Sequence, residues 1–184
     1  MNKYYYDKKS AAKAIGFIEQ FVTHTKGELS GQKLILESWQ KKIVGDIFGW
    51  KDKKTKLRKY RTVFIEVPRK NGKSTLCAAI GLYMLFADEE RGSEVYSAAG
   101  DRAQAGIVFE IAKGMILQSP ELSQRGKAFR NSIVNESKGN FYQAISSDSK
   151  TKHGFNANCI IFDELHTQPN RDLWDTLVTS TGSR

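Results

Sequence analysis

Residues 61–75, RTVFIEVPRKNGKST, decide the fold of this chain. The apolar run from Val63 to Val67 is typical of a strand buried on both faces of a parallel sheet. Pro68 ends that strand because proline has no N–H to give to a ladder. A loop ending in Gly72-Lys73-Ser74 follows, and residues 74–87 are apolar almost all round, which predicts a core helix. A strand, a loop and a core helix in this order predict a phosphate-binding loop, the Walker A motif.

The residue types at the end of this loop suit a nucleoside triphosphate. Gly72 lets the backbone approach a phosphate, Lys73 offers an ammonium to the β and γ phosphates, and the Ser74 hydroxyl can ligate Mg2+. Thr75 lies one position further into the helix. Val67 stands where the usual motif has its first glycine, so the match is partial. The alternative is a basic turn between a strand and a helix.

A second apolar run, Cys159 to Phe162, ends in Asp163 and Glu164. Ligands collect at the carboxyl ends of parallel strands, so these two acids would face the same crevice as the phosphate-binding loop. Asp163 is then placed to hold Mg2+, directly or through water, as in a Walker B motif. Glu164 can polarise the water that attacks the γ-phosphate of ATP. The alternative is the ordinary preference of acidic residues for the first turn of a helix.

Length and charge limit the remaining possibilities. A chain of 184 residues is large enough for one α/β domain and too short for two comfortable ones. Its 29 Lys and Arg residues outnumber 20 Asp and Glu residues, and the net charge of +9 favours polyanions as partners. Residues 51–61 hold seven basic residues and one acidic residue. This segment is either a contact for a nucleic-acid backbone or a solvated loop.

The cysteines and histidines indicate neither disulfides nor a zinc site. Cys77 and Cys159 fall within predicted buried elements and are interpreted as small apolar core residues in a reducing compartment. The three histidines, His24, His153 and His166, are scattered along the chain. No segment resembles a signal peptide or a membrane span, so we expect a cytoplasmic protein with no membrane partner.

Hydrophobic periodicity predicts the remaining elements. We expect helices around 11–22, after Ser38 as N-cap and up to Gly49, over 102–117, and after Pro169 and Asn170; a strand over 94–99; a hairpin around 135–140; and a loop over 148–158. Strands and helices therefore alternate. The fold class is α/β, with a mostly parallel sheet flanked by helices and a small helical segment at the N-terminus.

These motifs together resemble the N-terminal ATPase domain of the large terminase subunit of tailed bacteriophages, a P-loop NTPase of the ASCE type that packages DNA into a procapsid. The residues that carry the resemblance are Leu36–Gln40, Val67–Ser74, Ala98–Ala105, Ile160–His166 and Trp174. They span nearly the whole chain. The form Arg-Lys-Asn-Gly-Lys-Ser is much more specific than a generic phosphate-binding loop, and it explains why the leading glycine is missing.

The resemblance implies roles for further residues. Gln40 would read the adenine, and Arg69, Lys70 and Asn71 would join residues 72–75 in binding ATP. Arg69 would sense or stabilise the γ-phosphate, or it is simply one more cation beside the loop. The implied partners are double-stranded DNA, the portal protein, the small terminase subunit and further copies in a homo-oligomeric ring, in the cytoplasm of the host cell.

The resemblance also implies a domain boundary. We expect one ATPase domain over 1–184, with a helical lead-in over 1–50 and a P-loop core over 60–184. In the family a further core strand with a Thr/Ser-rich coupling motif follows, and then a nuclease domain. That strand would lie between the phosphate-loop strand and the acidic strand, so we expect a truncated chain that hydrolyses ATP poorly and cuts no DNA.

Two other functions fit parts of the sequence. The run Asp163-Glu164-Leu165-His166 has the Asp-Glu-x-His form of a superfamily 2 helicase. A helicase also needs a second motor domain. The other alternative is a catalytically silent nucleic-acid-binding module whose phosphate-binding loop has decayed at Val67.

Overall fold

The computed structural model describes residues 2–100, 102–146, 154–168 and 170–181. Asp101, most of the expected loop over 148–158, and Pro169 at the expected start of the last helix lie outside the described residues. The expectations for those positions therefore stay predictions.

The N-terminal part consists of two helices and a small two-stranded sheet. Its elements are β1 (Tyr4–Tyr6), α1 (Lys8–Phe21), α2 (Ser38–Gly49) and β2 (Trp50–Asp52), with β1 and β2 antiparallel. The Asp7 side chain caps α1 by accepting hydrogen bonds from the N–H groups of Lys9 and Ser10. The predicted small helical segment at the N-terminus is confirmed by α1 and α2, whereas the small sheet was not predicted.

The N-cap of α2 is Glu37, one residue before the predicted Ser38. Glu37 and Gln40 form a capping box, in which the Gln40 side chain accepts a hydrogen bond from the Glu37 N–H at 2.9 Å. Glutamate is not among the commonest N-caps, so composition alone favoured the serine. The two reciprocal hydrogen bonds between Glu37 and Gln40 therefore place the start of α2.

The rest of the chain forms the main sheet and its helices. The elements are α3 (Lys73–Phe86), β3 (Glu94–Ala99), α4 (Arg102–Leu117), α5 (Pro120–Arg125), β4 (Lys127–Ala128), β5 (Ser132–Asn135), β6 (Asn140–Ser146), β7 (Ala157–Phe162), the 3-10 helix η1 (Leu165–Thr167) and α6 (Asp172–Ser180). Among the described residues the strand order is β4-β5-β6-β3-β7. β3 is parallel to both of its neighbours, while β5 is antiparallel to both of its neighbours, β4 and β6.

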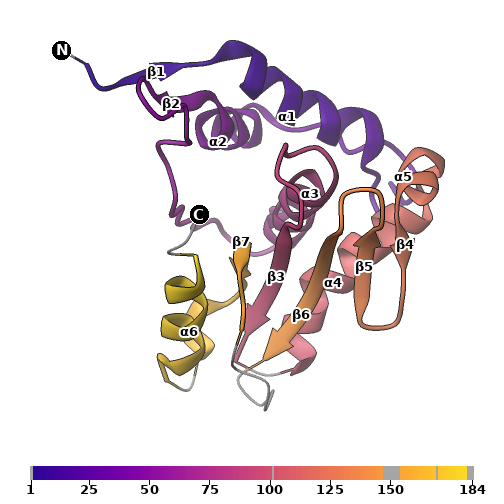
Figure 1. Ribbon diagram of the computed structural model, residues 1–184. Coiled ribbons are helices and arrows are strands. Elements are labelled where there is room, and N and C mark those ends of the chain that lie inside the picture. Colours follow the sequence, from indigo (N-terminus) through magenta and orange to yellow (C-terminus); the bar gives the residue numbers. More distant parts are fainter. Residues whose placement is uncertain (1, 101, 147–153, 169, 182–184) are drawn as a thin grey trace.

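Helices cover the central strands on both faces. Along β3, Val95 packs in the cluster that contains α3 and α4, while Tyr96 packs with Leu173 and Leu177 of α6. This alternation is the period of two that a strand imposes on its side chains. Figure 1 shows α6 in yellow on the opposite side of the sheet from α4. The expected α/β sheet flanked by helices is confirmed.

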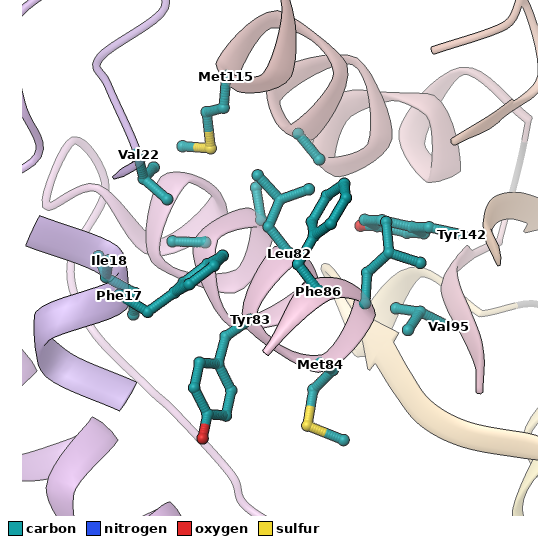
Figure 2. Packing of buried hydrophobic residues seen from close by; sticks show 14 of the residues in the cluster. Phe17, Ile18, Val22, Leu82, Tyr83, Met84, Phe86, Val95, Met115 and Tyr142 are labelled. Carbon is teal, nitrogen blue, oxygen red and sulfur yellow. The ribbon is translucent and has the colours of Figure 1, made fainter. Parts of the chain in front are cut away.

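Helix α3 lies at the centre of the main core (Figure 2). Its apolar residues contact α1 through Phe17 and Ile18, α4 through Met115, and the sheet through Val95 and Tyr142. A helix surrounded in this way must be apolar on every side, as the sequence predicted. The packing fixes the N-terminal end of α3, where the phosphate-binding loop lies.

Replacing Leu82 with alanine is expected to destabilise the protein by about 2–5 kcal/mol, because the side chain is fully buried and its loss leaves a cavity. Chemical denaturation measures this cost. The matched control is Leu117→Ala at a position that is 66% exposed, where we expect a change within about 0.5 kcal/mol. Equal effects at the two positions would contradict the central place of α3 in the core.

The predicted strand over Val63 to Val67 is wrong. Residues 62–68 have no regular secondary structure, and Phe64 is 77% exposed. Figure 1 shows the segment between β2 and α3 as a coil. The physical reason is pairing: residues 62–68 do not pair with β7, the edge strand on this side of the described sheet, so no ladder holds them as a strand.

The two cysteines are free and pack against the main core. Burial raises the pKa of each thiol to about 12, so both are inert at neutral pH. No helix in the described part of the chain has the length and apolar character needed to cross a membrane.

Candidate nucleotide-binding site

The phosphate-binding loop is held by backbone geometry that few residues adopt. Helix α3 begins at Lys73, and its N-cap Gly72 has φ 72° and ψ 19°, in the left-handed region that favours glycine. Lys70 also has a positive φ of 68°. The Asn71 side chain donates hydrogen bonds to the carbonyl oxygens of Pro68 and Arg69, at 3.1 and 3.3 Å. The loop therefore ends in free N–H groups of a helix N-terminus, which bind anions.

The two motifs meet in space. Lys73 Nζ lies 2.7 Å from Glu164 Oε1 and 3.4 Å from Asp163 Oδ1. The Ser74 hydroxyl donates a hydrogen bond to Asp163 Oδ2 at 2.9 Å. Asp163 follows β7 directly and is 6% exposed, while Glu164 is more accessible. The end of an apolar strand and the start of a core helix thus bring one ammonium, one hydroxyl and two carboxylates together.

The charges in this cluster stabilise one another. The hydrogen bond from Lys73 holds the pKa of Glu164 below its usual value, and the same bond raises the pKa of Lys73. Both groups are therefore ionised at neutral pH. Lys73 is not free in this structure, because it already has two carboxylate partners.

Glu164 lies in a strained backbone conformation, with φ 50° and ψ 51°. A non-glycine residue in the left-handed region costs on the order of 1 kcal/mol, and such residues cluster at functional sites. This left-handed conformation turns the backbone sharply between β7 and η1. His166 Nδ1 lies 3.5 Å from Glu164 Oε2, on the side of the carboxylate away from Lys73. Glu164 is thus positioned by the backbone and by two neighbouring side chains.

The other predicted site residues lie at different distances from this cluster. Gln40 is buried, and a Cβ added at Gly72 would lie 3.7 Å from its Nε2, so α2 places Gln40 beside the loop. Arg69 is exposed, and its charge contributes slightly to the lowered pKa of Glu164, after the larger effects of Lys73 and His166. Thr75 lies inside α3, one residue after Ser74.

A hydroxyl and a carboxylate already in contact suit Mg2+, which prefers oxygen ligands and keeps several waters. Ser74 and Asp163 therefore fit a magnesium ion bound together with phosphate oxygens. In the described part of the chain no three His, Cys, Asp or Glu side chains gather at one point. This does not conflict with Mg2+, which is commonly bound through one or two carboxylates and the substrate phosphates.

Sequence reasoning missed the direct pairing of Lys73 with Glu164. The residues were assigned to different parts of the reaction, whereas their opposite charges also attract each other directly. The sequence did contain a signal for this ion pair, because the two motifs predicted to face one crevice carry opposite charges. The contact between His166 and Glu164 has a weaker signal, a histidine two residues after the glutamate.

The comparisons with known proteins agree with this geometry. The family model described as the ATPase domain of the terminase large subunit matches residues 38–184, which is most of the chain. The chain is 30% identical over 180 residues to the terminase large subunit of Enterobacteria phage HK97, covering 93% of this chain and 34% of that protein. It is 26% identical over 200 residues to the terminase large subunit of Lactococcus phage SK1, covering 98% of this chain and 37% of that protein.

A solved structure gives the same answer. The crystal structure of the HK97 bacteriophage large terminase matches with a TM-score of 0.80 and 27% identity, over 95% of this chain and 35% of that one. The chain thus spans about a third of the length of the relatives that it matches. With the family model covering residues 38–184 and the Walker-type residues converging in space, the chain belongs to the family of terminase large subunit ATPase domains.

Proposed function

We propose that this chain is the ATP-binding and ATP-hydrolysing motor module of a phage terminase large subunit, which powers the packaging of double-stranded DNA into procapsids. The observation that carries the proposal is that the carboxylates of Asp163 and Glu164 both lie within 3.4 Å of the Lys73 ammonium. The family match does not favour the helicase or the silent binding module.

In the proposed reaction a water attacks the γ-phosphate of ATP. Glu164 orients that water and polarises it, which suits an accessible carboxylate that is ionised at neutral pH. Lys73 and Arg69 offset the negative charge of the transferring phosphoryl group. Ser74 and Asp163 would hold Mg2+, which supplies further positive charge at the β and γ phosphates. Gln40 would contact the adenine, and residues 69–75 would line the phosphates.

The proposal extends to the surroundings of the motor. We place the protein in the cytoplasm of a host cell, with double-stranded DNA, the portal protein and the small terminase subunit as partners. A homo-oligomeric ring is the arrangement in which such a module would act. These 184 residues would form one ATPase unit, with 1–50 as the helical lead-in and 60–184 as the P-loop core.

ATP with Mg2+ is expected to raise the melting temperature of the purified chain in a saturable manner. At a ligand concentration of about 100 times Kd, binding stabilises the folded state by about 2.7 kcal/mol. A thermal melt over a range of ATP concentrations measures this shift, and the control is the same titration in excess EDTA. We expect slow phosphate release under the same conditions. A melt that ATP and Mg2+ leave unchanged would contradict the proposed function.

A further inference from the structure

Residues 50–59, which begin with β2 and hold most of the basic segment, form an ordered hairpin with an exposed turn. Asp52 N–H bonds to the Leu57 carbonyl at 2.9 Å, and Lys59 N–H bonds to the Trp50 carbonyl at 2.8 Å. The Asp52 side chain closes the turn by accepting from the N–H groups of Lys54 and Thr55, at 2.8 and 3.0 Å. The sequence left open whether these residues were simply solvated, and their hydrogen bonds give them a fixed backbone.

The hairpin is also anchored to the body of the molecule. Arg58 forms an ion pair with Asp88 at 2.9 Å, just beyond the end of α3, and its guanidinium lies over the Phe48 ring of α2. Lys51 pairs with Asp7 at 3.2 Å. Figure 1 shows β1 and β2 together at one edge of the molecule, next to the N-terminal helices. These contacts hold the hairpin in one orientation on the protein and so fix the direction in which its turn points.

The acidic residues of this region, Asp7 and Asp52, bind backbone N–H groups and lysines of the N-terminal part. The exposed lysines of the turn therefore give a positive surface. Hydrogen bonds from the Thr55 and Lys54 backbone hold the pKa of Asp52 below its usual value, and Lys3 lies 3.6 Å away. The exposed turn carries Lys53, Lys54 and Lys56. Within the described residues, Lys53 and Lys54 have no acidic side chain at ion-pair distance. A cluster of this kind attracts a polyanion.

The aromatic residues around the hairpin indicate which polyanion fits. Lys59 Nζ lies 5.1 Å from the centres of the Tyr4 and Trp50 rings and 4.7 Å from that of Tyr60. Lys56 lies over the Tyr5 ring at 5.1 Å. These ring faces are occupied by ammonium groups, so they are poor platforms for stacking an unpaired base. The surface suits the phosphates of a duplex better than a single strand.

We propose that the hairpin of residues 50–59 contacts the phosphate backbone of double-stranded DNA through Lys53, Lys54 and Lys56. This inference rests on the proposed function, which supplies duplex DNA as a partner but assigns no residue to it. Phosphate contacts of this type fix position and are independent of base sequence, as the substrate of a translocating motor requires.

The test replaces Lys53, Lys54 and Lys56 with glutamine, which keeps the side-chain stems and removes three charges. Fluorescence anisotropy follows binding of a labelled duplex of mixed sequence to the chain, between about 50 and 200 mM salt. We expect an affinity loss of at least about tenfold at the lowest salt, and a salt slope smaller by about 2.7, from about 0.9 for each lost contact. The melting temperature should not change.

The matched control replaces Lys26, Lys113 and Lys127 with glutamine, which removes the same charge from other parts of the surface. Figure 1 shows β4, which carries Lys127, across the molecule from β2. Equal losses in the two triple variants would overturn the inference, because net charge alone would then explain DNA binding. Unchanged DNA binding in the hairpin variant would also overturn it and would favour an acidic protein as the partner of this surface.

The ATP titration is repeated on the same samples, so that the two proposals can fail separately. If ATP binding persists while the hairpin proves irrelevant to DNA, only the inference fails. If the unmodified chain binds no ATP, the proposed function fails, whatever the DNA result. Preferential binding of a single strand over the duplex would overturn the assignment of the partner.

Discussion

Replacing Lys73 with alanine is expected to lower ATP turnover by about a thousandfold or more, because the group that faces the β and γ phosphates is lost from a site that acts by charge stabilisation. Nucleotide affinity should fall as well. In the structure Lys73 lies at the start of α3 and reaches both acidic residues. A phosphate-release assay and an ATP titration of the melting temperature measure the two effects.

Two further variants separate this effect from a change in folding. Lys73→Arg keeps a positive charge beside Asp163 and Glu164, so it should preserve the fold, yet we expect weak turnover because a planar guanidinium does not substitute for an ammonium. Lys26→Ala removes one exposed lysine that is not part of the proposed site and should leave turnover unchanged. Normal turnover by Lys73→Ala would remove this residue from the proposed mechanism.

Local sequence signals predicted most elements of the fold. Helix α4 was predicted with the residue bounds that the structure has, because it carries a clear helical period. The bounds of β3, which follows a polar segment, were also predicted. The hairpin of β5 and β6 was also predicted. Sequence did not predict that β6 pairs in parallel with β3, because that pairing depends on where α4 and α5 deliver the chain. A local pattern contains no information on such a contact.

The strand predicted over Val63 to Val67 failed for a related reason. The run is as apolar as β7, and its composition favours a strand. A strand, however, needs a neighbour for its backbone N–H and C=O groups, and this run does not pair with β7, the edge of the described sheet. The phosphate-binding loop still reaches its place, because α3 is fixed by its own packing against α1, α4 and the sheet.

The candidate site was predicted better than the sheet around it. Lys73, Ser74, Asp163 and Glu164 were chosen from two short motifs, and the structure brings all four together. Motif chemistry is robust because each residue type is set by its task at a phosphate. The chemistry of the motifs did not predict the contacts that these four residues make with one another. Those contacts depend on which opposite charges lie nearest in the folded chain.

The contacts in this structure imply a competition at the site. Lys73 Nζ lies 2.7 Å from Glu164, while in the proposed reaction it must face the phosphates. ATP binding therefore has to replace the bond between Lys73 and Glu164 with a bond between Lys73 and phosphate. The carboxylate of Glu164 also repels the γ-phosphate, as two negative charges do. Glu164 would thus oppose nucleotide binding while it serves hydrolysis.

Replacing Glu164 with glutamine is therefore expected to have opposite effects on the two steps. Turnover should fall by about a hundredfold to ten-thousandfold, because an amide cannot accept a proton from the attacking water. ATP should still bind, and more tightly than in the unmodified chain, because Lys73 is released and the repulsion is removed. Phosphate release under single-turnover conditions reports the first effect, and titration of the melting temperature with ATP and Mg2+ reports the second.

The matched control is Glu136→Gln, which breaks an exposed ion pair with Lys127 by the same chemical change. It should alter neither turnover nor ATP affinity, because exposed pairs contribute little to stability and this one lies on β4 and the turn after β5. Normal turnover by Glu164→Gln would remove the assigned base. Weaker ATP binding by the same variant would show that Glu164 helps to hold the nucleotide, and the competition between carboxylate and phosphate for Lys73 would then be wrong.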